Sequence, residues 1–321
     1  MLVGWQSSMP VRCSHALHQQ HARSSPRCCS HYDRRYAHLA VVGGCISTAL
    51  PVTAATLAPQ LPPFLQAPSP GSLLQASPSQ QLISNPGNSW AFTDAGRQLY
   101  YPSWLEGTWA VSASFQGAGF PLGSRFISKA VPGVTKGSML MAMADVGAAQ
   151  DVNCLWHIRF LRTPLGVVAD RSFNVQQQAD ALLGYEAVKS VEYEPDVNPT
   201  RLAVVWATPR RNEGPASFDM RKAEVFINNR SSDPLNDSPC SWSCSELYRQ
   251  VSQAARQGSV GDYQVITKFV AASGVDVCDT ATGVEAQMRV AAFLQPQDAL
   301  YFETGGKAVA VYDYRMQLSR V

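Results

Sequence analysis

The sequence predicts an all-β protein, folded as an antiparallel up-and-down β-barrel with one or two short helices. After Trp90, apolar and polar residues alternate with a period of two, as in residues 109–115 and 154–160, so each segment has one face to bury. Turn-forming clusters such as Pro132-Gly133 and Gly305-Gly306 separate these segments. About ten short strands at regular spacing are typical of a barrel rather than of an α/β fold.

The expected strands follow one another from residue 109 to residue 318. They lie at residues 109–115, 123–129, 139–143, 154–161, 166–175, 186–194, 201–207, 218–228, 262–272, 284–294 and 307–318. One helix is predicted from Ser243 to about Gln257, because Ser243 and Glu246 match a capping box that satisfies free amides of a first helical turn. A shorter helix is expected over residues 177–183.

The first 54 residues have the composition of a targeting leader. Residues 1–32 contain no acidic residue and are rich in Arg, Ser and His, as organellar transit peptides are. Arg34-Arg35 then precedes a mildly apolar run, residues 37–55, which resembles a twin-arginine export signal. Residues 1–54 therefore predict a bipartite presequence and a location in the chloroplast thylakoid lumen. The alternative is a single transmembrane anchor over the same run, but its glycines favour cleavage near Ala54, which leaves no anchor.

Residues 55–89 are rich in Pro, Ser and Gln, which predicts a linker, and the barrel domain is expected over residues 90–321. Five of the 26 basic residues and one of the 24 acidic residues precede residue 55, so the remainder has a formal charge of about −2. Nucleic-acid binding requires an excess of positive charge on the protein surface, which this domain lacks. Nucleic acid is therefore excluded as a partner.

The predicted mature domain has few imidazole groups for catalysis or metal binding, because His157 is the only histidine after the predicted leader. A catalytic triad or a zinc site needs more imidazole than that, so no catalytic, metal or cofactor site is predicted. His157 alone could ligate a haem or sense acidification of the lumen. A solvated or hydrogen-bonded strand histidine is the simpler interpretation.

Asp170 and Arg171 lie in an apolar stretch that is expected to be a strand. Adjacent strand residues point to opposite faces, so one of the two can face the barrel interior. It would pair there with another charge, such as Arg315 or Glu285. The pair is either a polar anchor for the head group of a ligand or a structural ion pair at the end of the barrel.

Sulfur-bearing side chains are further candidates. Cys240 and Cys244 lie four residues apart at the start of the predicted helix. They allow a disulfide with each other, disulfides with Cys154 or Cys278, a reactive thiol at the helix N-terminus, or inert thiols. Met141, in an alternating run of methionines, could line a pocket for a flat apolar ligand or belong to an ordinary core.

Gly107-Thr108-Trp109, at the start of the first expected strand, resembles the Gly-x-Trp signature of lipocalins and their calycin relatives. The resemblance implies a calycin-like barrel in which Trp109 closes one end. It also implies that an arginine of the last strand packs across that tryptophan. Arg315 is the candidate for this arginine.

A closer resemblance covers most of residues 101–321. It rests on Tyr101-Pro102-Ser103-Trp104-Leu105-Glu106-Gly107-Thr108-Trp109, Phe120-Pro121-Leu122-Gly123, Val168-Ala169-Asp170-Arg171-Ser172-Phe173-Asn174, Ser245-Glu246-Leu247-Tyr248-Arg249-Gln250-Val251 and the strand from Tyr312 to Leu318. These segments resemble an uncharacterised domain family of cyanobacteria, algae and plants. The resemblance implies a role in oxygenic photosynthesis and brings no catalytic residues.

Two functions follow as hypotheses. The first is a non-enzymatic lumenal protein that holds a small apolar ligand, such as a pigment, quinone or lipid, inside the barrel. The second is an auxiliary or assembly factor that docks on a photosynthetic membrane complex through its outer surface or through the helix predicted from Ser243. A redox or isomerase enzyme that uses Cys244 or Asp170 is the alternative.

Overall fold

The computed structural model describes residues 98–143, 153–210, 217–235, 240–253, 258–272 and 282–321. The chain divides into two compact units, and all of these residues belong to the second unit, Leu61–Val321. The predicted leader and the predicted linker, residues 1–54 and 55–89, lie outside the described residues.

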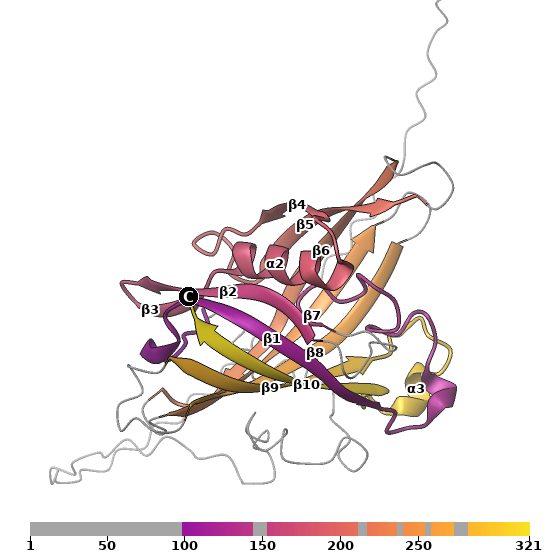
Figure 1. The fold of residues 1–321 in the computed structure, drawn as a ribbon. Coiled ribbons are helices and arrows are strands. Elements are labelled where there is room, and N and C mark those ends of the chain that lie inside the picture. The colour runs from indigo at the N-terminus through magenta and orange to yellow at the C-terminus, as the bar shows by residue number, and fades with distance from the viewer. Residues whose placement is uncertain (1–97, 144–152, 211–216, 236–239, 254–257, 273–281) are drawn as a thin grey trace, which may run out of the picture. The chain divides into compact units, whose positions relative to one another are not determined.

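Ten antiparallel strands form one sheet, which confirms the predicted all-β class (Figure 1). Their order across the sheet is β3-β2-β1-β10-β9-β8-β7-β6-β5-β4. Their bounds are β1 Gly107–Gly119, β2 Asn153–Thr163, β3 Gly166–Ala169, β4 Val188–Glu192, β5 Arg201–Pro209, β6 Phe218–Ser232, β7 Ser241–Gln253, β8 Gly258–Ala271, β9 Gly283–Phe293 and β10 Ala310–Arg320.

The strands follow chain order around a curled half-barrel, because the first strand, β1, pairs with the last strand, β10. Among the described strands this order is broken between β3 and β4, which are the two edges of the sheet. We call that break the seam. Helix α2 (Arg171–Leu183) connects the two edges and packs beside β2 and β4 (Figure 1). A helix therefore replaces strand pairing at the seam.

Helix α2 begins where the sequence predicted that a strand would continue. Asp170 is its N-cap and accepts a hydrogen bond from the Phe173 amide at 3.2 Å, and Gly184 ends it with a φ of 83°. The strand predicted over 166–175 is therefore confirmed only in its first part, and the helix predicted over 177–183 starts earlier. Neither α2 nor α3 (Tyr301–Thr304) is long and apolar enough to cross a membrane.

The helix predicted from Ser243 to Gln257 is wrong, because this part of the chain contains β7 in the middle of the sheet. β7 pairs with β6 on one side and with β8 on the other, so the sheet satisfies the amides that a capping box would serve. Side chains are buried on both faces of β7. Its apolar residues Leu247 and Val251 lie four positions apart, a spacing that also fits a helical period.

Part of the segment that connects β1 to β2 lies inside the half-barrel. The Leu140 amide donates to Gln250 Oε1 at 2.9 Å, and the Met141 amide donates to the Tyr263 hydroxyl at 3.2 Å. The Tyr312 hydroxyl donates to the carbonyl oxygen of Pro132 at 2.9 Å. We call residues 126–143 the plug segment; its buried side chains include Phe126, Val131, Met139, Leu140 and Met143.

The strands predicted at 123–129 and 139–143 are therefore wrong. Gly133 and Gly137 adopt positive φ angles of 91° and 77°, which turn the chain. The backbone of the plug segment bonds to side chains of β7, β8 and β10 instead of to a neighbouring strand. The alternation of methionines reflects burial in the barrel core and not strand pairing.

An arginine of β10 packs across the Trp109 ring, and this arginine is Arg320. Trp109 is fully buried, and its Nε1 donates to the carbonyl oxygen of Leu105 at 2.8 Å. The Arg320 guanidinium lies 4.5 Å from the centre of the Trp109 ring and opposite it in the β1–β10 register. Arg315, the arginine expected here, pairs with Glu285 at 3.2 Å on the exposed face. Side chains alternate along a strand, so residues 315 and 320 face opposite sides.

Replacing Gly133 by Ala should destabilise the fold by about 3 kcal/mol, because the new Cβ would lie 2.6 Å from the Tyr312 ring at a φ of +91°. Gly305→Ala is the control: its φ is +58° with no atom within 4 Å, so it should cost only about 1 kcal/mol. Chemical denaturation of the purified protein measures both losses. Equal losses would contradict tight packing of the plug segment on Tyr312.

Candidate functional site

A cavity of about 140 Å³ remains between the sheet, α2 and the plug segment. We call it the barrel cavity. Side chains from β1, β2 and β7 to β10 line it, together with the inner face of α2. Its wall is polar near Arg171 and Glu246 and apolar near the methionines Met141, Met288 and Met316.

Glu246, on β7, is the acceptor at the centre of a buried charge cluster. Its Oε1 accepts from Arg171 Nη2 at 2.7 Å and from Arg230 Nε at 2.9 Å. Its Oε2 accepts from Arg171 Nη1 at 3.2 Å and from the Tyr248 hydroxyl at 2.5 Å. The side chains of Arg171, Arg230 and Glu246 are 4%, 2% and 8% exposed, so solvent screens these bonds little. We call Glu246, Arg171, Arg230 and Tyr248 the buried cluster.

The start of α2 places Arg171 in this cluster. Asp170 Oδ2 accepts from Arg159 on β2 at 2.6 Å and 2.9 Å, while Asp170 Oδ1 caps the helix. Asn174 then bonds to the backbone of Arg159, accepting from its amide at 2.7 Å and donating to its carbonyl at 3.1 Å. One turn of helix is thereby fixed to the edge of β2, and Arg171 reaches Glu246 on β7.

Electrostatics keep Arg171 and Glu246 charged and their neighbours neutral. Burial alone would lower the pKa of Arg171, but Glu246 raises that pKa well above its usual value. Burial alone would raise the pKa of Glu246, but Arg171 and Arg230 lower that pKa below its usual value. Burial also raises the pKa of Tyr248 and of the Cys244 thiol well above their usual values, so both stay protonated.

Three side chains that line the barrel cavity carry buried N–H groups without a partner among the described residues. They are the indole N–H of Trp156 on β2, the Nε–H of Arg171 and the side-chain amide of Gln178 on α2. A buried donor without a partner costs about 1–3 kcal/mol. Three such donors therefore belong to side chains that line one cavity.

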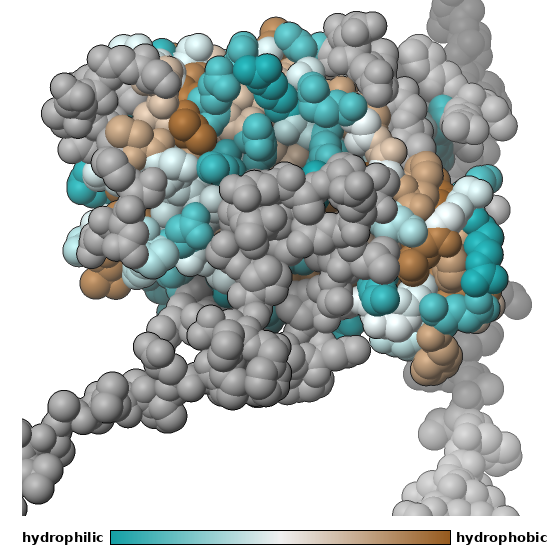
Figure 2. All heavy atoms as spheres, turned by 90° about the horizontal axis from the view of Figure 1, so that it is seen from below, coloured by the Kyte–Doolittle hydropathy of each residue, from teal (hydrophilic) through white to brown (hydrophobic). Residues whose placement is uncertain are grey.

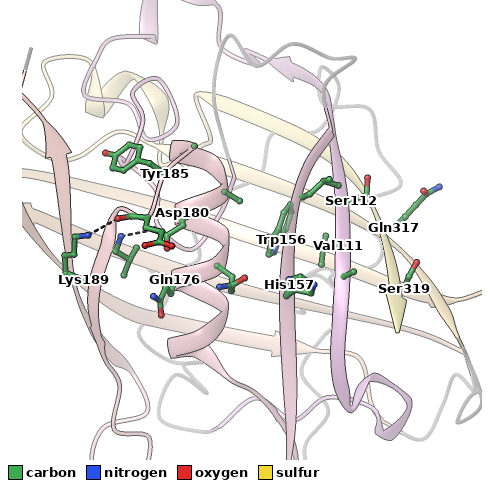
Figure 3. A pocket seen from close by; sticks show the side chains of 17 residues that line it. Val111, Ser112, Trp156, His157, Gln176, Asp180, Tyr185, Lys189, Gln317 and Ser319 are labelled. Atoms are coloured by element: carbon green, nitrogen blue, oxygen red, sulfur yellow. Dashed lines mark hydrogen bonds between the residues drawn. The ribbon is translucent and has the colours of Figure 1, made fainter. Parts of the chain in front are cut away.

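A second hollow, of about 800 Å³, lies on the outer side between α2 and β2 (Figure 3). We call it the outer groove. His157 lines it with an exposed side chain, and Asp180 lines it from α2, where its carboxylate accepts two backbone amides of the chain that enters β4. Among the described residues, no three His, Cys, Asp or Glu side chains gather to hold a metal ion. Trp156 and Val111 line both the groove and the cavity.

The structure separates most of the site residues named from the sequence. Trp109 packs against Arg320, and Arg315 lies on the exposed face. Asp170 and Arg171 do form ion pairs, but with Arg159 and Glu246 and not with Arg315 or Glu285. Met141 lines the barrel cavity.

The cysteines differ in their bonding state. Cys240 is disulfide-bonded, whereas Cys244 and Cys154 are free thiols, so Cys240 and Cys244 do not pair with each other. Cys278 lies outside the described residues. Cys244 lines the barrel cavity from a strand and not from a helix start, and burial raises its pKa. That opposes the reactive thiolate that a helix N-terminus would have favoured.

Sequence reasoning missed Glu246, Arg230 and Tyr248 as site residues. Glu246 was assigned to a capping box, which removed it from consideration. A signal was present: Cys244, Glu246, Tyr248 and Gln250 occupy alternate positions, so in a strand they share one face. Side chains at alternate positions of a strand lie next to one another, so this pattern brings Glu246, Tyr248 and Gln250 to one face.

Residues 94–321 match the family described as Domain of unknown function (DUF6816). The chain belongs to this family. The matched range contains every strand of the sheet, so the barrel cavity and the buried cluster are parts of the DUF6816 domain. No curated protein and no solved structure matches the chain significantly.

Replacing Glu246 by Gln should destabilise the DUF6816 domain by about 3–5 kcal/mol, because two buried guanidiniums lose their counter-charge. The folded pKa of Glu246 is lowered, so its contribution is present above the unfolded pKa of about 4.3 and is lost as the pH falls through the folded pKa. The difference between wild type and variant should therefore shrink below about pH 4. Denaturant titrations from pH 3 to pH 7 measure it.

Glu285→Gln is the matched control, because the pair of Glu285 with Arg315 is exposed on both sides. Its loss should stay below about 1 kcal/mol at every pH. A Glu246→Gln variant that is as stable as this control would show that the buried cluster contributes nothing to the fold.

Proposed function

We propose that this domain is a non-enzymatic binding protein that holds a small molecule in the barrel cavity. The observation that carries the proposal is the set of three unpaired N–H donors around one cavity, next to a buried ion cluster. Buried charges and unpaired donors are costly to a fold. A ligand that completes their hydrogen bonds accounts for their presence.

The size of the cavity limits the ligand. A volume of about 140 Å³ holds roughly five water molecules at about 30 Å³ each. Pockets for drug-sized ligands measure about 300–1,000 Å³. With the plug segment inside the half-barrel, the cavity has no room for the pigment, quinone or lipid that the sequence suggested. The proposed ligand is therefore much smaller.

Binding is favoured over catalysis by the state of the polar groups. The Glu246 carboxylate accepts four hydrogen bonds and has no lone pair to spare for proton transfer. The Cys244 thiol has a raised pKa, which disfavours a nucleophilic thiolate. Asp170, the other residue named for an enzyme, caps α2 and pairs with Arg159.

The proposed place of action is the thylakoid lumen. Its support is the composition of residues 1–54, with an acid-free segment, a twin arginine and a mildly apolar run. A link to photosynthesis is supported by the same leader. After cleavage near Ala54 the protein would carry no membrane anchor.

A second candidate function is an auxiliary factor that docks on a photosynthetic membrane complex. The specific observation in its favour is Phe302 on α3, which is 85% exposed. The docking helix expected from Ser243 is the buried strand β7, so it offers no surface. The view from below shows apolar residues in several patches separated by polar ones (Figure 2).

Native mass spectrometry of the protein purified from its own organism should show a bound small molecule that denaturation releases. Cys244→Met should lower ligand affinity more than about tenfold, because the longer side chain occupies part of the 140 Å³ cavity. Cys154→Met, the same change at a thiol outside the cavity lining, should leave binding unchanged. A mass equal to that of the bare chain would contradict the proposed function.

Fractionation of isolated thylakoids should place the mature protein in the protease-protected lumen, released by mild sonication. On native gels it should run apart from the photosystems. Co-migration with a photosystem that is lost in the Phe302→Ser variant would favour the second candidate function instead. Recovery in the stroma or in mitochondria would refute the proposed location.

A further inference from the structure

The strand β2 has a stretch that pairs with another strand on one side only. β3 covers β2 from Phe160 to Thr163, and the chain then turns into α2 at Asp170. On this side of β2, the residues before Arg159 have no strand beside them within the described part of the chain. A strand edge of this kind presents unpaired backbone groups. We call residues 154–158 the free edge.

The alternation of the backbone shows which residues of the free edge point away from β1. The Arg159 amide donates to Asn174 Oδ1 at 2.7 Å, and the Arg159 carbonyl accepts from the Asp170 amide at 2.9 Å, both on the side of α2. In an antiparallel strand, alternate residues direct their N–H and C=O groups to the same side. Leu155 and His157 therefore direct theirs toward α2, and no group of the described residues bonds to them there.

These backbone groups open into the outer groove. Trp156 and His157 line the groove from β2, and Gln177 and Ala181 line it from α2. In Figure 3, α2 lies opposite the part of β2 that carries Trp156 and His157. The groove measures about 800 Å³, within the range of about 300–1,000 Å³ that binding sites occupy. α2 is therefore a wall across the groove and not a partner for this backbone.

The other strand edges at the seam are protected against pairing. On β3, the Tyr101 amide donates to the backbone at 2.8 Å. β4 has a register shift between Val188 and Ser190 and an exposed Lys189, and both features hinder the addition of a further strand. The free edge has no register shift, no Pro and no Lys, Arg, Asp or Glu, and its Leu155 side chain is 68% exposed. It lacks the features that keep strand edges unpaired.

We propose that the outer groove binds an extended peptide segment of another protein, which adds as a strand to the free edge. This site is a second one beside the barrel cavity, and it does not rest on the proposed function. The segment exchanges backbone hydrogen bonds with Leu155 and His157. Its residue opposite Trp156 points its side chain to the same face as that ring. Val111 and Ala181 also line the groove, so this side chain is apolar.

The chemistry of the groove identifies the occupant. Two residues in line, each with a free donor and a free acceptor, match another extended backbone. The charged side chains of the groove have both signs, and two already bond to the backbone: Asp180 accepts two amides, and Lys189 donates to the Glu186 carbonyl at 2.9 Å. The groove therefore suits a segment without strong net charge. A second copy of this chain fits less well, because its own free edge lies beside its own α2.

The first test removes single N–H donors from the partner. A peptide selected from a displayed library of random sequences on the full chain is the probe, and fluorescence anisotropy measures its Kd. N-methylation at alternate peptide residues should weaken binding at least about tenfold, and at the residues between by less than about threefold. Equal effects at all positions, or a selection that yields no binding peptide, would overturn the proposal.

The second test removes one donor from the free edge. Leu155→Pro deletes an N–H that points away from β1, and Pro is accepted at such a position of an edge strand. This variant should stay folded and bind the peptide at least about tenfold more weakly. Leu155→Ala is the matched control, because it keeps the N–H, and it should weaken binding by less than about threefold. Equal weakening by both variants would show that the side chain binds and not the edge.

Hydrogen exchange of the unaltered chain, followed by NMR, tests the same claim without a variant. The amides of Leu155 and His157 should exchange fast in the free protein and at least about tenfold more slowly with the peptide. The amide of Trp156, which points to β1, should be slow in both states. Peptide binding that leaves Leu155 and His157 unprotected would place the peptide elsewhere. Protection of both amides without peptide would also overturn the proposal: it would assign the edge to a second copy if it rises with protein concentration, and to the chain itself if it does not.

Discussion

The pairing of one buried carboxylate with two guanidiniums holds the barrel together where its strands do not pair. The seam between β3 and β4 is spanned by α2, and Arg171 at the start of that helix bonds twice to Glu246 on β7. Charges buried this deeply are stable only while every partner is present. The position of α2, and with it one wall of the barrel cavity, therefore depends on Glu246.

The plug segment determines what the half-barrel can hold. It fills the interior with its own side chains and is bound there by Gln250, Tyr263 and Tyr312. What remains is a small cavity with a charged end and an apolar end. The plug segment therefore leaves the half-barrel with only a small internal space.

The sequence predicted the parts of the fold that local patterns determine. β1, β2 and β10 were found because their side chains alternate between a buried and an exposed face. β7 was mistaken for a helix because Ser243 and Glu246 match a capping box, although both residues lie in a central strand. The cluster could not be predicted, because Arg171 and Glu246 lie 75 residues apart and meet only through the strand order. Arg315 was chosen over Arg320 because the β1–β10 register, which sets the facing side, is not readable from one strand.

The central claim is that the barrel cavity is a binding site and not a packing defect. A high-resolution crystal structure of the protein purified from its own organism tests it most directly. The account predicts continuous density for a small molecule that accepts hydrogen bonds from Arg171, Trp156 and Gln178. A cavity that is filled only by separate water molecules, or closed by rearranged side chains, would contradict it.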